Sequence, residues 1–178
     1  IAQAFPAQNV IAIEPLAANF SNLEETISLN RLSNVRTINA AVTESDEAVQ
    51  LYINPINDGG GSLIEPTQHK TGDVSIDVPA YQAKNTNFVA AEEVAVLRLD
   101  DLITTPSVLK IDVEGAEVTV LKSGMNALKS GLVDLMVLEV TKETVHEVIQ
   151  ILDAAQFDCF NCGQPLTKVD ASQFTGRL

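Results

Sequence analysis

The chain contains little that would commit it to disulfide, metal or nucleic-acid chemistry. Its 178 residues include no tryptophan, two cysteines and two histidines, and aromatic residues make up only 4%. Lys and Arg total 11 against 24 Asp and Glu, which gives a formal net charge of -13. Most of the surface would therefore repel a phosphate backbone or an anionic membrane, so we expect no nucleic-acid partner.

Long apolar runs are also missing. No stretch reaches the roughly 20 residues that span a bilayer, and no basic segment followed by an apolar one opens the sequence. We therefore expect a cytoplasmic protein with no membrane partner. A hydrophobic content of 46% suffices for a core, and the length fits one domain over residues 1–178.

The cysteines and histidines assign no metal site. Cys159 and Cys162 have the C-x-x-C spacing, but a four-ligand zinc site needs a second pair, so packing in the core or in a hairpin is the better interpretation. His146 lies off its helix's apolar stripe and is expected to be exposed. His69 lies in a polar loop, as a plain surface histidine or as a base that faces substrate.

Strands and helices alternate at both ends of the chain. In the first part, an apolar strand at Val10–Ile13 precedes a helix that closes near Asn30 and a second strand at Val35–Ile38. The helix is predicted from the spacing of its apolar residues: Leu16, Phe20, Leu23 and Ile27. This β-α-β unit predicts parallel strands joined by a right-handed crossover.

A β-rich insertion is expected at about 43–106. Its strand-like segments are Val49–Ile53, Val74–Val78 and Val94–Leu99, with no helical pattern between them. The glycine-bearing polar loops at 57–62 and 68–72 could form a lid. The three glycines of the first loop lack the Lys-Ser/Thr ending of a phosphate loop.

Alternation then resumes with a strand that starts at Val108, which we expect to be covered on both faces. A helix follows, then a strand at Val133–Leu138, a second helix, and a β-hairpin between Phe157 and Val169. The two helices are predicted from two apolar stripes: Val118, Leu121, Met125 and Leu128, then Val145, Val148, Ile149 and Leu152.

Carboxylates stand at the ends of three of these strands: Glu14, Asp112 and Glu139. Ligands of open α/β sheets collect beyond the carboxyl ends of the strands, so we expect the three acids to share one rim. Glu14, followed by Pro15, could accept hydrogen bonds from both hydroxyls of a ribose. Its alternatives are a solvent-facing side chain or a cap on the following helix.

Lys110 and Asp112 share a strand face, and a lysine on the inner part of a covered strand needs a partner. A local ion pair with Asp112 or Glu139 is the structural explanation. Functionally, Asp112 could accept a proton from a substrate hydroxyl, or could ligate Mg²⁺ together with Glu139. Gly115 could allow close approach of a ligand to the backbone or serve only as a turn residue.

At these residues the sequence resembles the FkbM family of S-adenosylmethionine-dependent methyltransferases over nearly its whole length. The segment 11–15 (Ile-Ala-Ile-Glu-Pro) with Asn19-Phe20 and Leu29-Asn30 looks like the family's acid-bearing second strand and following helix. Residues 38–42 (Ile-Asn-Ala-Ala-Val) are similar to its third strand and 99–102 (Leu-Asp-Asp-Leu) to its lead-in. Residues 110–117 (Lys-Ile-Asp-Val-Glu-Gly-Ala-Glu) resemble its signature block.

The resemblance implies a class I, Rossmann-like methyltransferase fold: a doubly wound, mostly parallel sheet of seven strands that ends in an antiparallel hairpin. It implies O-methylation of a sugar or another small natural product, with S-adenosylmethionine as cofactor. Carried over by position, the cofactor residues are Glu14, Pro15, Asn39, Ala40 and Ala41. The catalytic candidates are Asp112, Lys110 and Glu139, and the candidates facing substrate are Glu114 and His69.

One part of the family pattern is not found. The first strand and its glycine-rich loop, which cradle the methionine part of the cofactor, should precede Ile1. That strand would lie centrally, beside the second and fourth, so its loss should expose ladder groups and apolar area. A partner chain such as a second copy, a rearranged sheet or domain exchange could fill the gap.

Three hypotheses about function stay open at this point. The first is a methyltransferase domain that acts on a small-molecule hydroxyl and is inactive if the N-terminal motif is essential. The second is a non-catalytic methyltransferase-like remnant or assembly module. The third is a fragment of a dinucleotide-binding oxidoreductase, because Glu14 would also suit that ribose; the segment Asp112-Val-Glu-Gly115 argues against it.

Overall fold

The computed structural model describes residues 1–53, 61–63, 89–113, 115–162 and 166–169. The chain divides into two compact units, one formed by Ile1–Ala41 with Ser45–Val96 and the other by Val42–Glu44 with Leu97–Leu178. The expectation of a single domain over residues 1–178 therefore stays a prediction.

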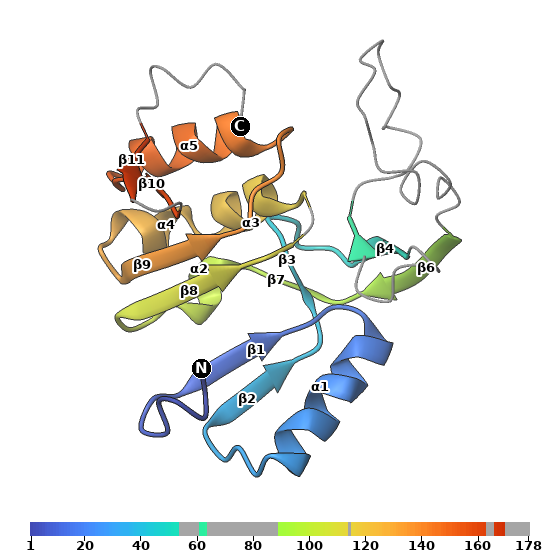
Figure 1. Ribbon diagram of the computed structural model, residues 1–178. Helices are drawn as coiled ribbons and strands as arrows, with labels where there is room; N and C mark the ends of the chain where they lie inside the picture. The colour runs from blue at the N-terminus through green and yellow to red at the C-terminus, as the bar shows by residue number, and fades with distance from the viewer. Residues whose placement is uncertain (54–60, 64–88, 114, 163–165, 170–178) are drawn as a thin grey trace. The chain divides into compact units, whose positions relative to one another are not determined.

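The first unit begins with the expected β-α-β arrangement (Figure 1). Strand β1 (Val10–Ile13) pairs in parallel with β2 (Val35–Ile38), and helix α1 (Ala17–Leu29) joins them. Three residues of the predicted stripe, Phe20, Leu23 and Ile27, are half-buried, whereas most other positions of α1 are exposed. The predicted parallel strands and the helix between them are confirmed, while the hand of the crossover stays a prediction.

The first unit also holds an antiparallel sheet in the order β5–β4–β6. Its strands are β4 (Val49–Ile53), β5 (Gly61–Ser62) and β6 (Val89–Val94). A small core of buried apolar side chains belongs to this unit: Leu16, Ala41, Leu51 and Val94. In the described part of 43–106 these strands agree with the expected β-rich character, but the insertion as a whole stays a prediction, because segment 74–78 and most of the two proposed lid loops lie outside the described residues.

The expected strand Val94–Leu99 was wrong at both ends. Strand β6 ends at Val94, the two-residue strand β7 (Val96–Leu97) follows, and Leu99 already opens the short helix α2 (Leu99–Leu102). The Leu99 side chain is buried in the core of the second unit, so its apolar character reflects helix packing rather than a longer strand. Another two-residue strand, β3 (Ala41–Val42), precedes the insertion.

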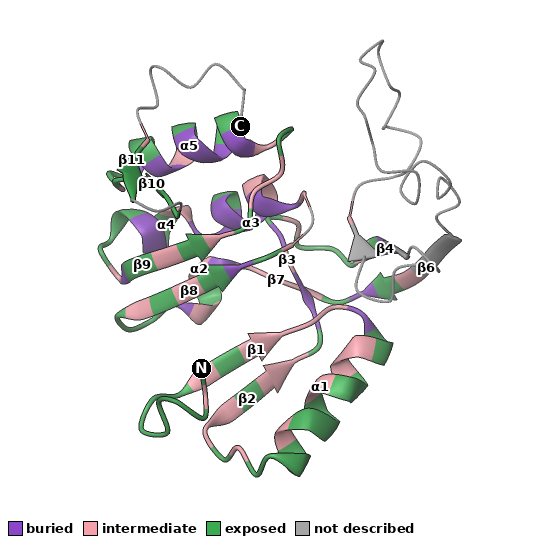
Figure 2. Cartoon of the chain, viewed as in Figure 1, coloured by how far each residue is buried: buried purple, intermediate pink, exposed green. Residues whose placement is uncertain are grey.

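The second unit contains the other parallel pair, β8 (Ser107–Ile111) with β9 (Val133–Leu138). Its helices besides α2 are α3 (Glu117–Ser123), α4 (Met125–Lys129) and α5 (Val145–Ala154). Figure 2 shows buried positions along α3 and α5, whose apolar residues join one core cluster with Ile111 and Val133 from the strands. The chain thus has mixed α/β content with two parallel pairs, while the order of a seven-stranded sheet stays a prediction.

The helix expected from Val118 to Leu128 is broken in two at Gly124. A Cβ atom at Gly124 would lie 2.6 Å from Cδ2 and 2.9 Å from Cβ of Leu99, closer than real Cβ atoms approach. The apolar spacing continues across the break, which is why periodicity alone predicted a single helix. The break lets α2 pack directly against the backbone at Gly124.

The C-terminal hairpin is present as β10 (Phe160–Asn161) and β11 (Thr167–Lys168), which pair antiparallel. Cys159 packs against the core of the second unit and Cys162 is exposed. The packing expectation is therefore confirmed for Cys159 and wrong for Cys162. His146 is exposed, as predicted.

One face of the β8–β9 pair is open, contrary to the expectation of a strand covered on both faces. Val108 is 65% exposed, and Leu135 and Val137 on β9 are 56% and 46% exposed. Val108 and Leu135 are paired neighbours, and Val137 pairs with Lys110, so these side chains share one face by the two-residue period. Among the described helices, none is long and apolar enough to cross a membrane.

Candidate functional site

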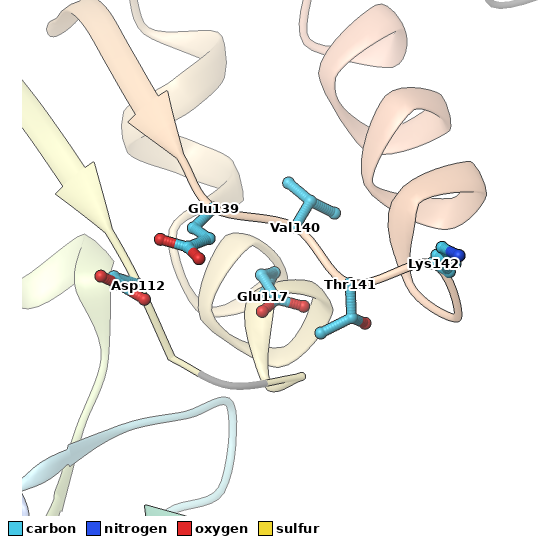
Figure 3. Close-up of a pocket in the computed structure, with 6 residues that line it drawn as sticks. All are labelled: Asp112, Glu117, Glu139, Val140, Thr141 and Lys142. Carbon is cyan, nitrogen blue, oxygen red and sulfur yellow. The ribbon is translucent and has the colours of Figure 1, made fainter. Parts of the chain in front are cut away.

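A cavity of about 270 Å³ lies in the second unit, beyond the carboxyl ends of β8 and β9 (Figure 3). Its lining combines the two strand-end acids with the start of α3 and the segment after β9: Asp112, Glu117, Glu139, Val140, Thr141 and Lys142. The Glu139 backbone N–H donates to the Ile111 carbonyl at 3.0 Å. This bond extends the ladder, so the two acids leave neighbouring strands at the same edge.

Lys110 contacts Asp112 directly. Its Nζ lies 2.6 Å from Asp112 Oδ2, and the two side chains are 54% and 43% exposed. The expectation that Lys110 lies on a covered inner face was wrong, because that side of β8 is open. The local ion pair expected as one alternative is present, and it places a cation beside one carboxylate of the cavity.

Sequence reasoning missed the role of Glu117, although Glu117 closes the signature block. Its side chain is only 1% exposed, and both carboxylate oxygens accept hydrogen bonds from protein groups. The available signal was a glutamate on the first turn of a helix just after a glycine, a position where an acid can satisfy free backbone N–H groups.

Glu14 lies in the first unit, half-buried at the end of β1. Its Oε1 accepts a hydrogen bond from the Leu16 backbone N–H at 2.9 Å, which fixes the carboxylate at the start of α1. One of the two Glu14 oxygens therefore acts as expected from the helix-capping alternative. A second carboxylate, on Glu92, accepts a hydrogen bond from the Ala17 N–H at 3.3 Å, a contact that no sequence pattern indicated.

Asn39 holds the turn that carries Glu14. Its side-chain Nδ2 donates to the backbone carbonyls of Glu14 and Pro15, at 2.8 and 3.0 Å. Ala40 and Ala41 are both buried, and the Ala41 N–H donates to the Ala95 carbonyl at 2.8 Å. Asn39 thus ties the backbone at Glu14 to the end of β2.

The expected convergence of all three strand-end acids is met for one pair. Asp112 and Glu139 share the cavity in the second unit, whereas Glu14 belongs to the first, so its approach to them stays a prediction. Glu114 and His69 lie outside the described residues. Within the described part of the chain, no group of three or more His, Cys, Asp or Glu side chains could hold a metal ion.

Comparison with known proteins identifies the family. The model of the methyltransferase FkbM domain matches residues 1–159. A protein of Beauveria bassiana (strain ARSEF 2860) named Methyltransferase 1 is 29% identical over 142 residues. The alignment covers 76% of this chain and 56% of the relative, so the chain spans little more than half of that protein. No solved structure matches the chain significantly. With strand-end acids at one cavity and the family match over most of its length, the chain belongs to the FkbM methyltransferase family.

Proposed function

We propose that the chain catalyses the S-adenosylmethionine-dependent O-methylation of a hydroxyl on a sugar or another small natural product. The observation that carries the proposal is the placement of Asp112 and Glu139, which leave adjacent parallel strands and line one cavity. Ligands of α/β sheets collect at such strand ends. Membership in the FkbM family supports methyl transfer as the chemistry.

Glu14 is the residue best suited to hold the cofactor. One of its oxygens is fixed by the Leu16 N–H, and Asn39 fixes the backbone on either side of the Glu14–Pro15 peptide. The other oxygen can accept from ribose hydroxyls, as strand-end acids of nucleoside-binding folds do. Pro15, Asn39, Ala40 and Ala41 would border the nucleoside. These residues thus fit a nucleoside cofactor, which when bound supplies an electrophilic methyl group.

In the cavity, Asp112 would accept the proton of the acceptor hydroxyl, and Lys110 would orient the Asp112 carboxylate through their ion pair. Glu139 would accept a hydrogen bond from a neighbouring hydroxyl and so hold the acceptor in place. Such a proton acceptor contributes about a hundredfold to ten-thousandfold in rate. The exposed acids Asp112 and Glu139, together with Thr141, suit a substrate rich in hydroxyl groups.

The cofactor assignment is tested by calorimetric titration of the chain with S-adenosylhomocysteine. We expect Glu14→Gln to weaken binding by about tenfold or more, because charge-assisted hydrogen bonds are about twice as strong as neutral ones. Glu92→Gln is the matched control, since Glu92 also accepts a bond at the start of α1. Equal affinity in wild type and Glu14→Gln would remove Glu14 from the ribose site. No binding to any variant at millimolar cofactor would favour the non-catalytic alternative.

The acceptor assignment is tested with radiolabelled S-adenosylmethionine against a panel of sugars and other hydroxylated compounds. Asp112→Asn should lower kcat by about a hundredfold or more. Asp134→Asn provides the control, because Asp134 is an exposed acid on β9 that does not line the cavity. Transfer to amines but not to hydroxyls would overturn O-methylation.

The cytoplasmic location, the small-molecule partner and a second copy that completes the sheet also stay predictions.

A further inference from the structure

Glu117 is a buried acid with an unusual pair of partners. Its Oε1 accepts a hydrogen bond from the Gly115 backbone N–H at 2.8 Å, and its Oε2 accepts one from the Thr144 hydroxyl at 2.6 Å. Burying a carboxylate is unfavourable unless hydrogen bonds replace its hydration, and bonds to a charged acceptor are stronger than neutral ones. Both oxygens of Glu117 are therefore committed to the protein.

The two partners belong to the two segments that carry the cavity's exposed acids. Gly115 lies in the turn between Asp112 and α3, with a φ of 97° that favours glycine. Thr144 ends the segment that begins at Glu139 and leads into α5. Its hydroxyl also lies 2.9 Å from the Thr141 hydroxyl, so the contact reaches a second residue of the cavity lining.

We propose that Glu117 is a positioning residue that clamps the turn after β8 to the segment after β9 and so keeps Asp112 and Glu139 facing one cavity. Figure 3 shows its side chain rising from the start of α3, with the two acids on the strand ends beside it. Glu117 acts through Gly115 and Thr144 and does not itself bind substrate. The consequence for catalysis rests on the proposed methyl transfer; the clamp itself does not.

Three substitutions separate the clamp from general stability. Glu117→Gln keeps both contacts, because the amide oxygen can accept from the Gly115 N–H while the amide nitrogen donates to the Thr144 hydroxyl. Glu117→Ala removes both contacts. Thr144→Val keeps the shape of the side chain and removes one donor, and the Thr144 side chain makes no capping bond to α5 that would be lost with it.

Glu147→Gln is the matched control. Glu147 also joins α3 to α5, through an ion pair with Lys122 at 2.7 Å, but both side chains are about half exposed and neither lines the cavity. Loss of this ion pair therefore tests whether any weakened contact between the two helices is enough to disturb the cavity.

Amide hydrogen exchange of the full chain reads the clamp without any ligand. We expect Glu117→Ala to speed exchange about tenfold or more both at 112–116 and at 139–144, because local opening governs exchange. Thr144→Val should speed exchange at the Gly115 amide, which lies 29 residues earlier in the chain. Glu117→Gln and Glu147→Gln should leave both segments near wild type. If Glu117→Ala fails to fold, Thr144→Val decides.

Unchanged exchange at Gly115 in Thr144→Val would overturn the clamp. So would equal acceleration in Glu147→Gln, since the effect would then be general loosening. In the transfer assay we expect Glu117→Ala to lower kcat about tenfold or more with little change in KM, and Glu117→Gln to restore it. If the wild type transfers no methyl group to any hydroxyl, the proposed function fails, whereas the exchange measurement still decides the clamp.

Discussion

Lys110 on β8 forms an ion pair with Asp112, which directly follows the strand, and Nζ lies 2.6 Å from Oδ2. Because successive side chains of a strand alternate in direction, this spacing puts both on the open face of the sheet. Solvent screens a pair exposed to this degree, and such pairs contribute about 0–1 kcal/mol to stability. We therefore expect the ion pair to matter less for stability than for the orientation of the Asp112 carboxylate.

Lys110→Met should therefore affect the proposed methyl transfer more than folding. We expect the free energy of unfolding to fall by less than about 1 kcal/mol, and kcat to fall roughly ten- to a hundredfold because Asp112 is no longer held in one orientation. Urea denaturation and the transfer assay measure the two effects. Lys168→Met is the control, since it breaks the exposed pair with Asp158 in the hairpin; an equal loss of kcat there would contradict the prediction.

Asp100 should prove to be a helix cap. Its Oδ1 accepts from the Ala127 N–H and its Oδ2 from the Asn126 side chain, both at 2.8 Å, at the start of α4. Asp100→Ala should lower the free energy of unfolding by about 1 kcal/mol, as the loss of a cap does. The neighbouring Asp101→Ala should change it by less than about 0.5 kcal/mol. Equal effects in chemical denaturation would show that charge, rather than capping, matters.

Gly124→Ala should destabilise the second unit. Alanine normally favours a helix over glycine by up to about 1 kcal/mol, but here the new Cβ would meet Leu99 at 2.6 to 3.0 Å. Overpacking of this kind typically costs about 1–3 kcal/mol, so the clash decides the sign. Thermal unfolding followed by circular dichroism measures the change.

A double mutant separates the clash from backbone effects. Combined with Leu99→Ala, Gly124→Ala should cost less than it does alone, because two of the three colliding atoms, Cδ2 and Cγ of Leu99, are gone and only Cβ remains. Gly131→Ala offers a contrast: Gly131 has a φ of 74° with no atom within 4 Å of the added Cβ, so its cost comes from the backbone and Leu99→Ala should not relieve it. Strict additivity at Gly124 would contradict the packing explanation.

Cys159 should react with alkylating reagents later than Cys162. Burial, aided by the nearby Asp153 and Asp158 charges, raises the pKa of the Cys159 thiol above its ordinary 9.0. The folded state thus holds this proton more tightly, so the linked stabilisation is present below pH 9.0 and is lost as pH rises through the folded pKa. Mass spectrometry after iodoacetamide treatment should show modification of the exposed Cys162 first, with Cys159 following as pH rises above 9.0. Equal rates near neutral pH would refute this order.

The sequence carried the information for elements whose pattern is local. Apolar runs ending in an acid located β8 and β9, and the parallel-strand rule brought Asp112 and Glu139 to one edge. The break at Gly124 was not predictable in the same way, because it arises from the approach of Leu99, 25 residues earlier (124 minus 99), while the apolar period continues unbroken.

The contacts that organise the candidate site were likewise long-range. Thr144 and Glu117 are separated by 27 residues and their bond depends on how α3 and α5 pack. Glu92 reaches the start of α1 from the β-rich insertion, 75 residues away from Ala17. No single-sequence periodicity encodes such pairs, so a sequence can propose the strand-end acids but not the buried partners that orient them.

The open face with Val108, Leu135 and Val137 has a practical consequence at the bench. We expect fluorescent probes that respond to apolar surfaces to bind this native patch below the unfolding transition. A dye-based thermal scan of this protein should then start from a bright baseline. Circular dichroism, which follows the backbone, is the sounder way to rank its variants.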